Sequence, residues 1–192
     1  MSAVPPTGHQ PTGHQKAARW ALWLPLVLFG AFVVLVLFGL LRPAEREVRS
    51  RMIGKPLPEF SLPPAVADRP GFARADMATG QPRLINIFAS WCIPCAVEAP
   101  QLLALKQAGV QIDGVAIRDQ RADVEAFLAR HGNPFARIGA DNVSAIQFAI
   151  GSSGVPESFV IDGKGVIRYQ HIGEIRPDQV PLILEKLKEA GR

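Results

Sequence analysis

The chain has 192 residues, of which 48% are hydrophobic and 20% charged, and this fits one folded domain with accessory segments. Its formal net charge of +4 is unevenly distributed, because residues 1–55 carry seven Lys or Arg and only two Glu. Residues 56–192 are therefore close to neutral. A nucleic-acid-binding domain concentrates basic residues on one face, so this distribution excludes nucleic acid as a partner of the C-terminal part.

The first segment, 1–19, is polar and rich in Pro, Gly and Gln, with the pentapeptide PTGHQ repeated at 6–10 and 11–15. Such a segment cannot bury enough apolar surface to fold. We therefore predict a disordered cytoplasmic tail rather than a metal site built on its two histidines.

An uninterrupted apolar run, Ala21–Leu41, follows without a single charge. At about 1.5 Å per residue it can cross a hydrocarbon layer of about 30 Å. Trp20 and Trp23 stand at its start and no small-residue cleavage site follows, so we predict an uncleaved transmembrane anchor at 20–41 in contact with membrane lipid. A basic linker follows at 42–55. The excess of Lys and Arg after the run, taken alone, favours a cytoplasmic C-terminal domain, but large domains cross membranes largely regardless of charge.

The only two cysteines of the chain, Cys92 and Cys95, lie between an apolar run at 84–88 and a helical pattern at 93–108. A C-x-x-C at a strand-to-helix junction is typical of a dithiol redox centre. The first cysteine meets the free N–H groups and the positive end of the helix dipole, which favour its thiolate. The second lies one turn on, close enough to attack a mixed disulfide. Pro94 fits the first turn, where its missing N–H costs little.

Three other interpretations of the cysteine pair remain. A structural zinc site would need four ligands, and no second C-x-x-C or closely spaced histidine pair follows. A copper site could use the two cysteines with a distant histidine, His131 or His171, and an inert disulfide is also possible. The strand, Trp-Cys-x-Pro-Cys and helix context favours redox chemistry, with the Cys92–Cys95 disulfide as the redox group and no bound cofactor or metal.

The remaining patterns predict a folded domain at 56–192 in which strands and helices alternate. We expect strands at 60–63, 84–88, 111–117, 135–138, 158–161 and 166–171, and helices at 93–108, 123–131, 143–149 and 177–190. The turn at 162–165 is a strong hairpin signal. This order predicts a mixed central sheet covered by helices on both faces. The apolar side chains that we assign to the core include Phe127, Phe148, Leu182, Leu184 and Leu187.

These residues resemble a known family. Trp91–Cys95 with Glu98 and Pro100, the run Gly154–Asp162 and the run Gly165–Gly173 are similar to the thioredoxin fold and, within it, to the membrane-tethered DsbE/CcmG group of cytochrome c maturation. The ResA- and TlpA-like reductases are its neighbours. The likeness covers about residues 50–192 and the single anchor. It implies an α/β, thioredoxin-like three-layer fold with one N-terminal transmembrane helix.

The resemblance also implies roles for single residues. Cys92 would be the attacking thiolate and Cys95 the resolving thiol. Pro156 matches the cis proline that faces the dithiol in this fold, where a cis bond turns the backbone of Val155 toward an extended client peptide. Trp91 would shield the dithiol and line the client groove, although plain packing is the alternative.

Two acids are candidates for proton transfer. Asn86 occupies the position of thioredoxin's buried acid, so Glu98 and Glu157 are the nearby carboxylates that could take the proton of Cys95. The alternative is that each is only a solvated surface residue. A carboxylate near Cys92 opposes the helix dipole, which favours a reductant over a strong oxidant.

The function implied by the resemblance is that of a single-pass bacterial inner-membrane protein whose C-terminal domain lies in the periplasm. It would reduce the C-x-x-C-H disulfide of apocytochrome c, or a cytochrome c maturation component, and would be recharged by a membrane electron donor of the DsbD/CcdA type. Two alternatives stay open: a general ResA/TlpA-like reductase with other clients, and a Cu(I) delivery or assembly module that uses the cysteine pair.

Overall fold

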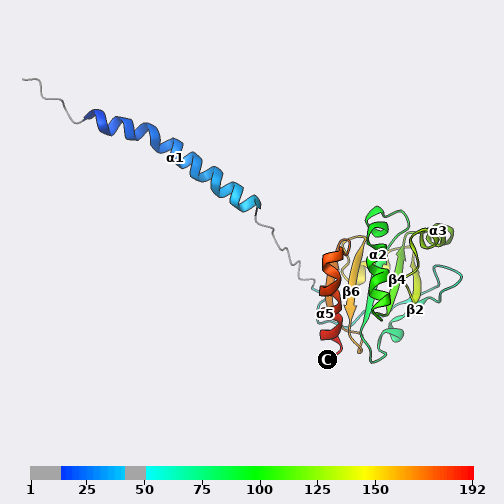
Figure 1. The fold of residues 1–192 in the computed structure, drawn as a ribbon. Helices are drawn as coiled ribbons and strands as arrows, with labels where there is room; N and C mark the ends of the chain where they lie inside the picture. Colours follow the sequence, from blue (N-terminus) through cyan, green and yellow to red (C-terminus); the bar gives the residue numbers. More distant parts are fainter. Residues whose placement is uncertain (1–13, 42–50) are drawn as a thin grey trace, which may run out of the picture. The chain divides into compact units, whose positions relative to one another are not determined.

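The computed structural model describes residues 14–41 and 51–192 (Figure 1). The chain divides into two units, Met1–Glu47 and Val48–Arg192. The predicted tail at 1–13 and most of the predicted linker, 42–50, lie outside the described residues.

The N-terminal unit contains one helix, α1, which covers His14–Leu41. It begins before the predicted start at Trp20, because Gln15, Lys16 and the two alanines that follow all favour a helix. Within the described part of the chain, no helix combines the length and the apolar character that a membrane span requires.

The C-terminal unit is built on a five-stranded sheet with the order β5-β4-β3-β6-β7. Strands β3, β4 and β5 are parallel, whereas β6 and β7 are antiparallel to their neighbours. Every residue of the central strand β3 is buried, which confirms the prediction of a buried central strand before the cysteines. The strands are β3 Arg83–Phe88, β4 Ile112–Ile117, β5 Arg137–Asp141, β6 Glu157–Ile161 and β7 Ile167–Ile172.

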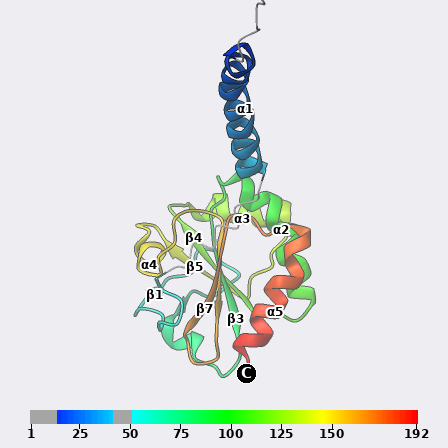
Figure 2. The same ribbon diagram turned by 90° about the vertical axis from the view of Figure 1, so that its left-hand side faces the viewer.

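Helices cover both faces of this sheet, as predicted. On one face α2 packs against both α3 and α5, while α4 lies on the opposite face (Figure 2). A two-stranded ribbon, β1 with β2, and a short 3-10 helix, η1, precede the sheet. The bounds are β1 Ser61–Leu62, β2 Phe72–Ala73, η1 Arg74–Met77, α2 Ile93–Gln107, α3 Arg121–His131, α4 Ala145–Ala149, η2 Pro177–Gln179 and α5 Val180–Ala190.

Two side chains assigned to the core lie on the surface instead. Phe148 on α4 is 62% exposed, because this five-residue helix buries Ile146 and turns Phe148 away from the sheet. Leu182 on α5 is also exposed, because Ile183 and Leu187, four residues apart, occupy the buried side of that helix. Phe127, by contrast, is buried as predicted.

The fold begins upstream of the predicted boundary at Pro56. The amide of Gly54 donates to the Ile167 carbonyl at 2.8 Å, and the amide of Ile167 donates to the Lys55 carbonyl at 3.0 Å. The segment therefore pairs with the outer edge of β7, and residues predicted as linker belong to the sheet edge.

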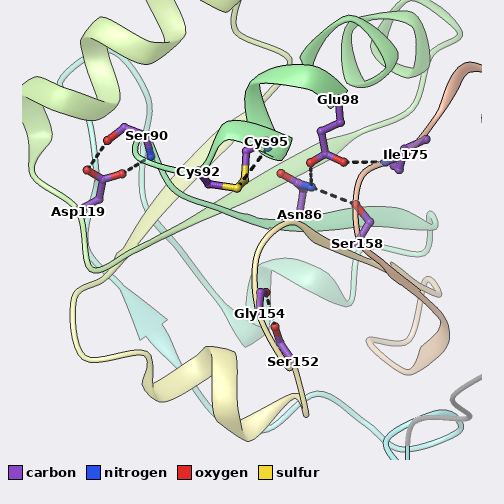
Figure 3. The surroundings of a disulfide bond; sticks show 10 residues. All are labelled: Asn86, Ser90, Cys92, Cys95, Glu98, Asp119, Ser152, Gly154, Ser158 and Ile175. Carbon is purple, nitrogen blue, oxygen red and sulfur yellow. Dashed lines mark hydrogen bonds between the residues drawn. A yellow bond between two sulfur atoms is a disulfide. The ribbon is translucent and has the colours of Figure 1, made fainter.

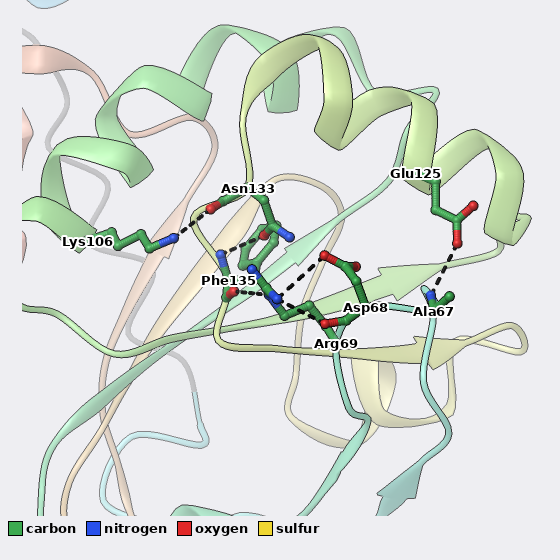
Figure 4. A network of polar contacts seen from close by, with 7 residues as sticks. All are labelled: Ala67, Asp68, Arg69, Lys106, Glu125, Asn133 and Phe135. Atoms are coloured by element: carbon green, nitrogen blue, oxygen red, sulfur yellow. Dashed lines mark hydrogen bonds and ion pairs between the residues drawn. The ribbon is translucent and has the colours of Figure 1, made fainter.

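A polar network fixes the connection between α3 and β5 (Figure 4). Lys106 donates to the Asn133 carbonyl at 2.9 Å, and Arg69 donates to the Phe135 carbonyl at 3.2 Å. The ring of Phe135 stacks on Phe88 with centroids 4.7 Å apart. Because Phe88 is the last residue of β3, this contact supports the strand end from which the cysteine motif emerges. β5 begins at Arg137, two residues after the predicted start at Phe135.

Candidate active site

The two cysteines form a disulfide at the start of α2 (Figure 3). Cys92 is the N-cap residue, and its Sγ accepts a hydrogen bond from the Cys95 amide at 3.2 Å. Pro94 occupies the first turn. In the reduced protein the same amide, together with the helix dipole, favours a thiolate on Cys92.

The two sulfurs have different surroundings. Cys92 borders a surface pocket of about 490 Å³ between α2 and α3, together with Trp91, Ile93 and His131. Cys95 instead borders a small internal cavity with a volume of about 10 Å³, and Asn86 and Glu98 line the same cavity. An incoming disulfide can therefore reach Cys92 from the pocket, whereas Cys95 faces groups that could handle a proton.

The residues before Cys92 are held by the connection between β4 and α3. Ser90 donates to the carboxylate of Asp119 from its amide at 2.5 Å and from its hydroxyl at 2.7 Å. The indole nitrogen of Trp91 donates to the Arg118 carbonyl at 3.3 Å, and the Trp91 ring stays 57% exposed. Trp91 thus forms part of the pocket wall rather than a buried packing contact.

Glu98 lies one turn after Cys95 and is 1% exposed, so it is not a solvated surface residue. Its carboxylate accepts from Asn86 Nδ2 at 2.9 Å and from the Ile175 amide at 3.0 Å. The pKa of Glu98 is raised from 4.5 to about 7, mainly by burial and to a lesser degree by the nearby Glu174, while these two hydrogen bonds lower it. A carboxyl group with this pKa can both accept and return a proton near neutral pH.

This raised pKa predicts a pH-dependent stability. Between pH 4.5 and pH 7 the unfolded chain has lost the Glu98 proton and the folded chain has kept it. The free energy of unfolding should therefore fall as the pH rises through this window, by about 3 kcal/mol at most. Urea unfolding of the oxidised full-length chain at several pH values measures it, with Glu98→Gln as the matched control. If the free energy of unfolding changed with pH by the same amount in both proteins, the prediction would be contradicted.

The predicted proline loop lies at the same end of the sheet as the dithiol. The Val155–Pro156 bond is cis, as predicted. Glu157 pairs with Ile87 across β6 and β3, which places this loop beside the strand end that leads to Cys92. Glu157 is itself buried, and it accepts from the Ser153 amide at 3.0 Å and from the Ser153 hydroxyl at 2.7 Å. Its carboxylate therefore closes the loop on itself, and no contact to Cys95 is seen.

The two histidines considered as copper ligands have other contacts, although His131 lines the same pocket as Cys92. The His131 ring packs on Phe127 with centroids 4.9 Å apart, and His171 Nε2 lies 3.3 Å from the Glu174 carbonyl. Over the described ranges, no group of three or more His, Cys, Asp or Glu side chains is arranged to hold a metal ion.

Several residues of the site escaped the sequence analysis. Asp119 is the second residue after a predicted strand, and the carboxyl ends of parallel strands meet at one edge of a sheet, so this position could have been found. The roles of the Ile175 amide and Ser158 could not have been found from the sequence, because only the folded chain brings them to Glu98 and Asn86.

Comparisons with known proteins agree with this geometry. The family model described as Redoxin matches residues 52–187. The thiol:disulfide interchange protein DsbE of Escherichia coli K12 is 38% identical over 185 residues, which cover 91% of this chain and 99% of that protein. The thiol:disulfide interchange protein HelX of Rhodobacter capsulatus is 36% identical over 170 residues, covering 88% and 96%.

A solved structure is also similar. The crystal structure of a DsbE-type thiol:disulfide interchange protein from Chlorobium tepidum has a TM-score of 0.61 and 27% identity, and the match covers 73% of this chain and 98% of that one. The chain therefore belongs to the Redoxin family and, within it, to the DsbE/HelX thiol:disulfide interchange proteins, and it is a disulfide oxidoreductase that works through Cys92 and Cys95.

Proposed function

We propose that this protein reduces the disulfide of the C-x-x-C-H segment of apocytochrome c, or of a cytochrome c maturation component. The observation that carries the proposal is the difference between the two sulfurs: Cys92 borders an open pocket, and Cys95 borders a cavity that holds a buried acid. A dithiol arranged in this way can bind a folded or extended client at Cys92 and transfer a proton between Cys95 and the buried acid.

In the first step the Cys92 thiolate attacks one sulfur of the client disulfide. A Cys92–client disulfide forms, and the second client sulfur leaves as a thiolate that takes a proton from water. In the second step Cys95 loses its proton and attacks Cys92 Sγ. The Cys92–Cys95 disulfide forms, the client is released with both sulfurs reduced, and two electrons have passed from the protein to the client.

Glu98 is the group that we assign to receive the Cys95 proton. It lies three residues after Cys95 on α2, borders the same cavity, and has a pKa of about 7. Glu157 we assign to a different task, because both of its oxygens hold Ser153 and so fix the loop that carries Val155 and Pro156. The backbone of Val155 is then available to pair with an extended client segment.

The proposed setting is the periplasmic side of a bacterial inner membrane, with 20–41 as a single-pass anchor and a DsbD/CcdA-type donor that returns electrons to the dithiol. The uncharged run Ala21–Leu41 supports the anchor. A reducing dithiol is also needed where the surroundings oxidise thiols, as in the periplasm. A reporter enzyme that is active only outside the cytoplasm, fused after Arg192, tests the compartment, and an inactive fusion would contradict it.

A trapping experiment tests the client. The Cys95→Ser full-length chain, reduced and mixed with an oxidised C-x-x-C-H peptide, should accumulate a covalent adduct through Cys92, because the resolving step is blocked. Mass spectrometry of the cleaved adduct identifies the linked cysteine.

Two comparisons sharpen this result. A peptide of the same composition with its cysteines in another spacing should be trapped at least about tenfold more slowly, since client contacts outside the disulfide are then lost. Equal trapping of both peptides would instead indicate a general reductase. Tight Cu(I) binding without any reduction of the peptide would indicate a copper-delivery module.

A further inference from the structure

Asn86 on β3 has an unusual set of hydrogen bonds for a fully buried amide. Its Nδ2 donates twice, to Glu98 at 2.9 Å and to the Ser158 hydroxyl at 3.1 Å (Figure 3). Its Oδ1 is buried and has no hydrogen-bond partner in the described part of the chain. A buried carbonyl oxygen without a partner costs free energy and calls for an explanation.

The arrangement fits Glu98 only while that residue is ionised. Both of its oxygens face donors, since one accepts from Asn86 and the other from the backbone amide of Ile175. A proton placed on Glu98 would bring its O–H against an N–H. The Ile175 amide cannot turn around because it is part of the backbone. Asn86, however, can exchange its oxygen and nitrogen by a half-turn about its last side-chain bond.

We infer that Asn86 is a positioning residue whose amide follows the proton of Glu98. With Glu98 ionised, Nδ2 points at the carboxylate and at Ser158, as observed. With Glu98 protonated, the turned amide presents Oδ1, which accepts from the carboxylic O–H and from the hydroxyl of Ser158. Each charge state of Glu98 then has one matching orientation. The half-turn gives Oδ1 two donors, while Nδ2 takes the place that Oδ1 leaves and gives up its two acceptors.

This inference rests on the proposed role of Glu98 as the acceptor of the Cys95 proton. In that role Glu98 must be stable in both forms, because it takes the proton in one half of the cycle and returns it in the other. A fixed donor would stabilise the ionised form only. An amide that turns offers a matching partner to Glu98 in both forms, so the proton can move in either direction without leaving the Glu98 carboxyl unsatisfied.

Other ionisable groups near Glu98 could in principle drive such a change. Cys95 shares its helix and cavity, Glu174 lies in the β7–α5 connection, and His171 on β7 contacts the Glu174 carbonyl. Glu157 on β6 is engaged with Ser153. Where the structure is described, however, the hydrogen bonds of the Asn86 side chain go to Glu98 and Ser158. The test must therefore separate Glu98 from these neighbours.

The test follows the amide directly by NMR. In the oxidised, isotope-labelled full-length chain in detergent micelles, the Asn86 side-chain N–H signals and the Glu98 carboxyl carbon are recorded from about pH 5 to pH 9, a range centred on the Glu98 pKa of about 7. The Asn86 signals and the Glu98 carboxyl signal should change with the same midpoint pH. In Glu98→Gln the Asn86 signals should no longer depend on pH, and in Ser158→Ala they should still follow Glu98.

Two variants of Asn86 give the complementary result. Asn86→Leu should raise the pKa of Glu98 by about one pH unit, because the donor lost to the charged form is worth more than the acceptor lost to the neutral form. Asn86→Asp, which keeps the shape but offers only acceptors to a protonated neighbour, should raise it as well. If Asn86→Leu does not fold, the Glu98 pKa measured in Asn86→Asp tests this prediction.

Three outcomes would overturn the inference: Asn86 signals that stay fixed while Glu98 titrates, Asn86 signals that still titrate in Glu98→Gln, or a Glu98 carboxyl that does not titrate in this range. No client takes part in these measurements. A failure to reduce C-x-x-C-H peptides would therefore contradict the proposed function and leave the amide result standing, and the reverse also holds.

Discussion

The Cys92→Ser variant is expected to reduce client disulfides at least about 10³-fold more slowly than the native chain. The reason is geometric as well as chemical. Cys92 borders the open pocket and caps α2, whereas Cys95 borders the internal cavity. The two residues are about equally buried, at 5% and 2% exposed, so the difference lies in what each sulfur faces. With Cys92 removed, no sulfur is presented to a client. Single-turnover reduction of an oxidised C-x-x-C-H peptide by the pre-reduced full-length chain measures the effect.

Cys95→Ser is the matched control for this experiment. It keeps the sulfur at the pocket, so its first step should proceed at nearly the native rate and then stop at the mixed disulfide. The opposite pattern, with a trapped adduct in Cys92→Ser and none in Cys95→Ser, would mean that the roles of the two cysteines are reversed.

Asp113→Ala is expected to lower the free energy of unfolding by about 3–5 kcal/mol. Asp113 on β4 is fully buried, and its carboxylate holds the guanidinium of Arg83 on β3 through two hydrogen bonds of 2.7 and 3.2 Å. Its removal leaves Arg83 charged and buried without this partner, because a guanidinium cannot give up its proton in a protein. Urea unfolding of the oxidised full-length chain measures the change.

Removing the other partner of the ion pair, Arg83, should lower the free energy of unfolding less. In Arg83→Met the remaining Asp113 can take a proton, and burial already raises its pKa against the pull of Arg83. The double variant Arg83→Met with Asp113→Leu removes both charges and should recover most of the lost stability. If Asp113→Ala proves harmless, or the double variant is worse than Asp113→Ala alone, this ion pair does not contribute as described.

Local patterns were enough to predict the elements on which the dithiol is built. The apolar run ending at Phe88 and the cysteine motif with Pro94 carry their own information about a buried strand and a helix start. The order of these elements predicted a mixed sheet covered on both faces, though not the order of its strands, and the family resemblance predicted the cis bond before Pro156. The side of a short helix is less certain from sequence, since α4 offers two large apolar residues and buries Ile146 but not Phe148.

The environment of Glu98 lay beyond such patterns. Its partners stand 12 residues before it, at Asn86, and 77 residues after it, at Ile175. Hydrophobic periodicity gives no hint that a glutamate on α2 faces the sheet. Only the packing of α2 and the β7–α5 connection over the sheet creates the buried site that sets its pKa.

The two hydrogen bonds from Ser90 to the Asp119 carboxylate, which together form a clasp, have a consequence for protein engineering. The tetrapeptide Cys-Ile-Pro-Cys looks like a portable cassette, yet the residue two positions before it is fastened by a carboxylate from the end of β4. Grafting the tetrapeptide onto another scaffold would transfer the sulfurs without the clasp or the acid behind them. The smallest unit that carries the sulfurs, the Asp119–Ser90 contact and Glu98 together is β3, α2 and β4 with the first residues beyond β4, and the Ile175 amide that also holds Glu98 lies outside it.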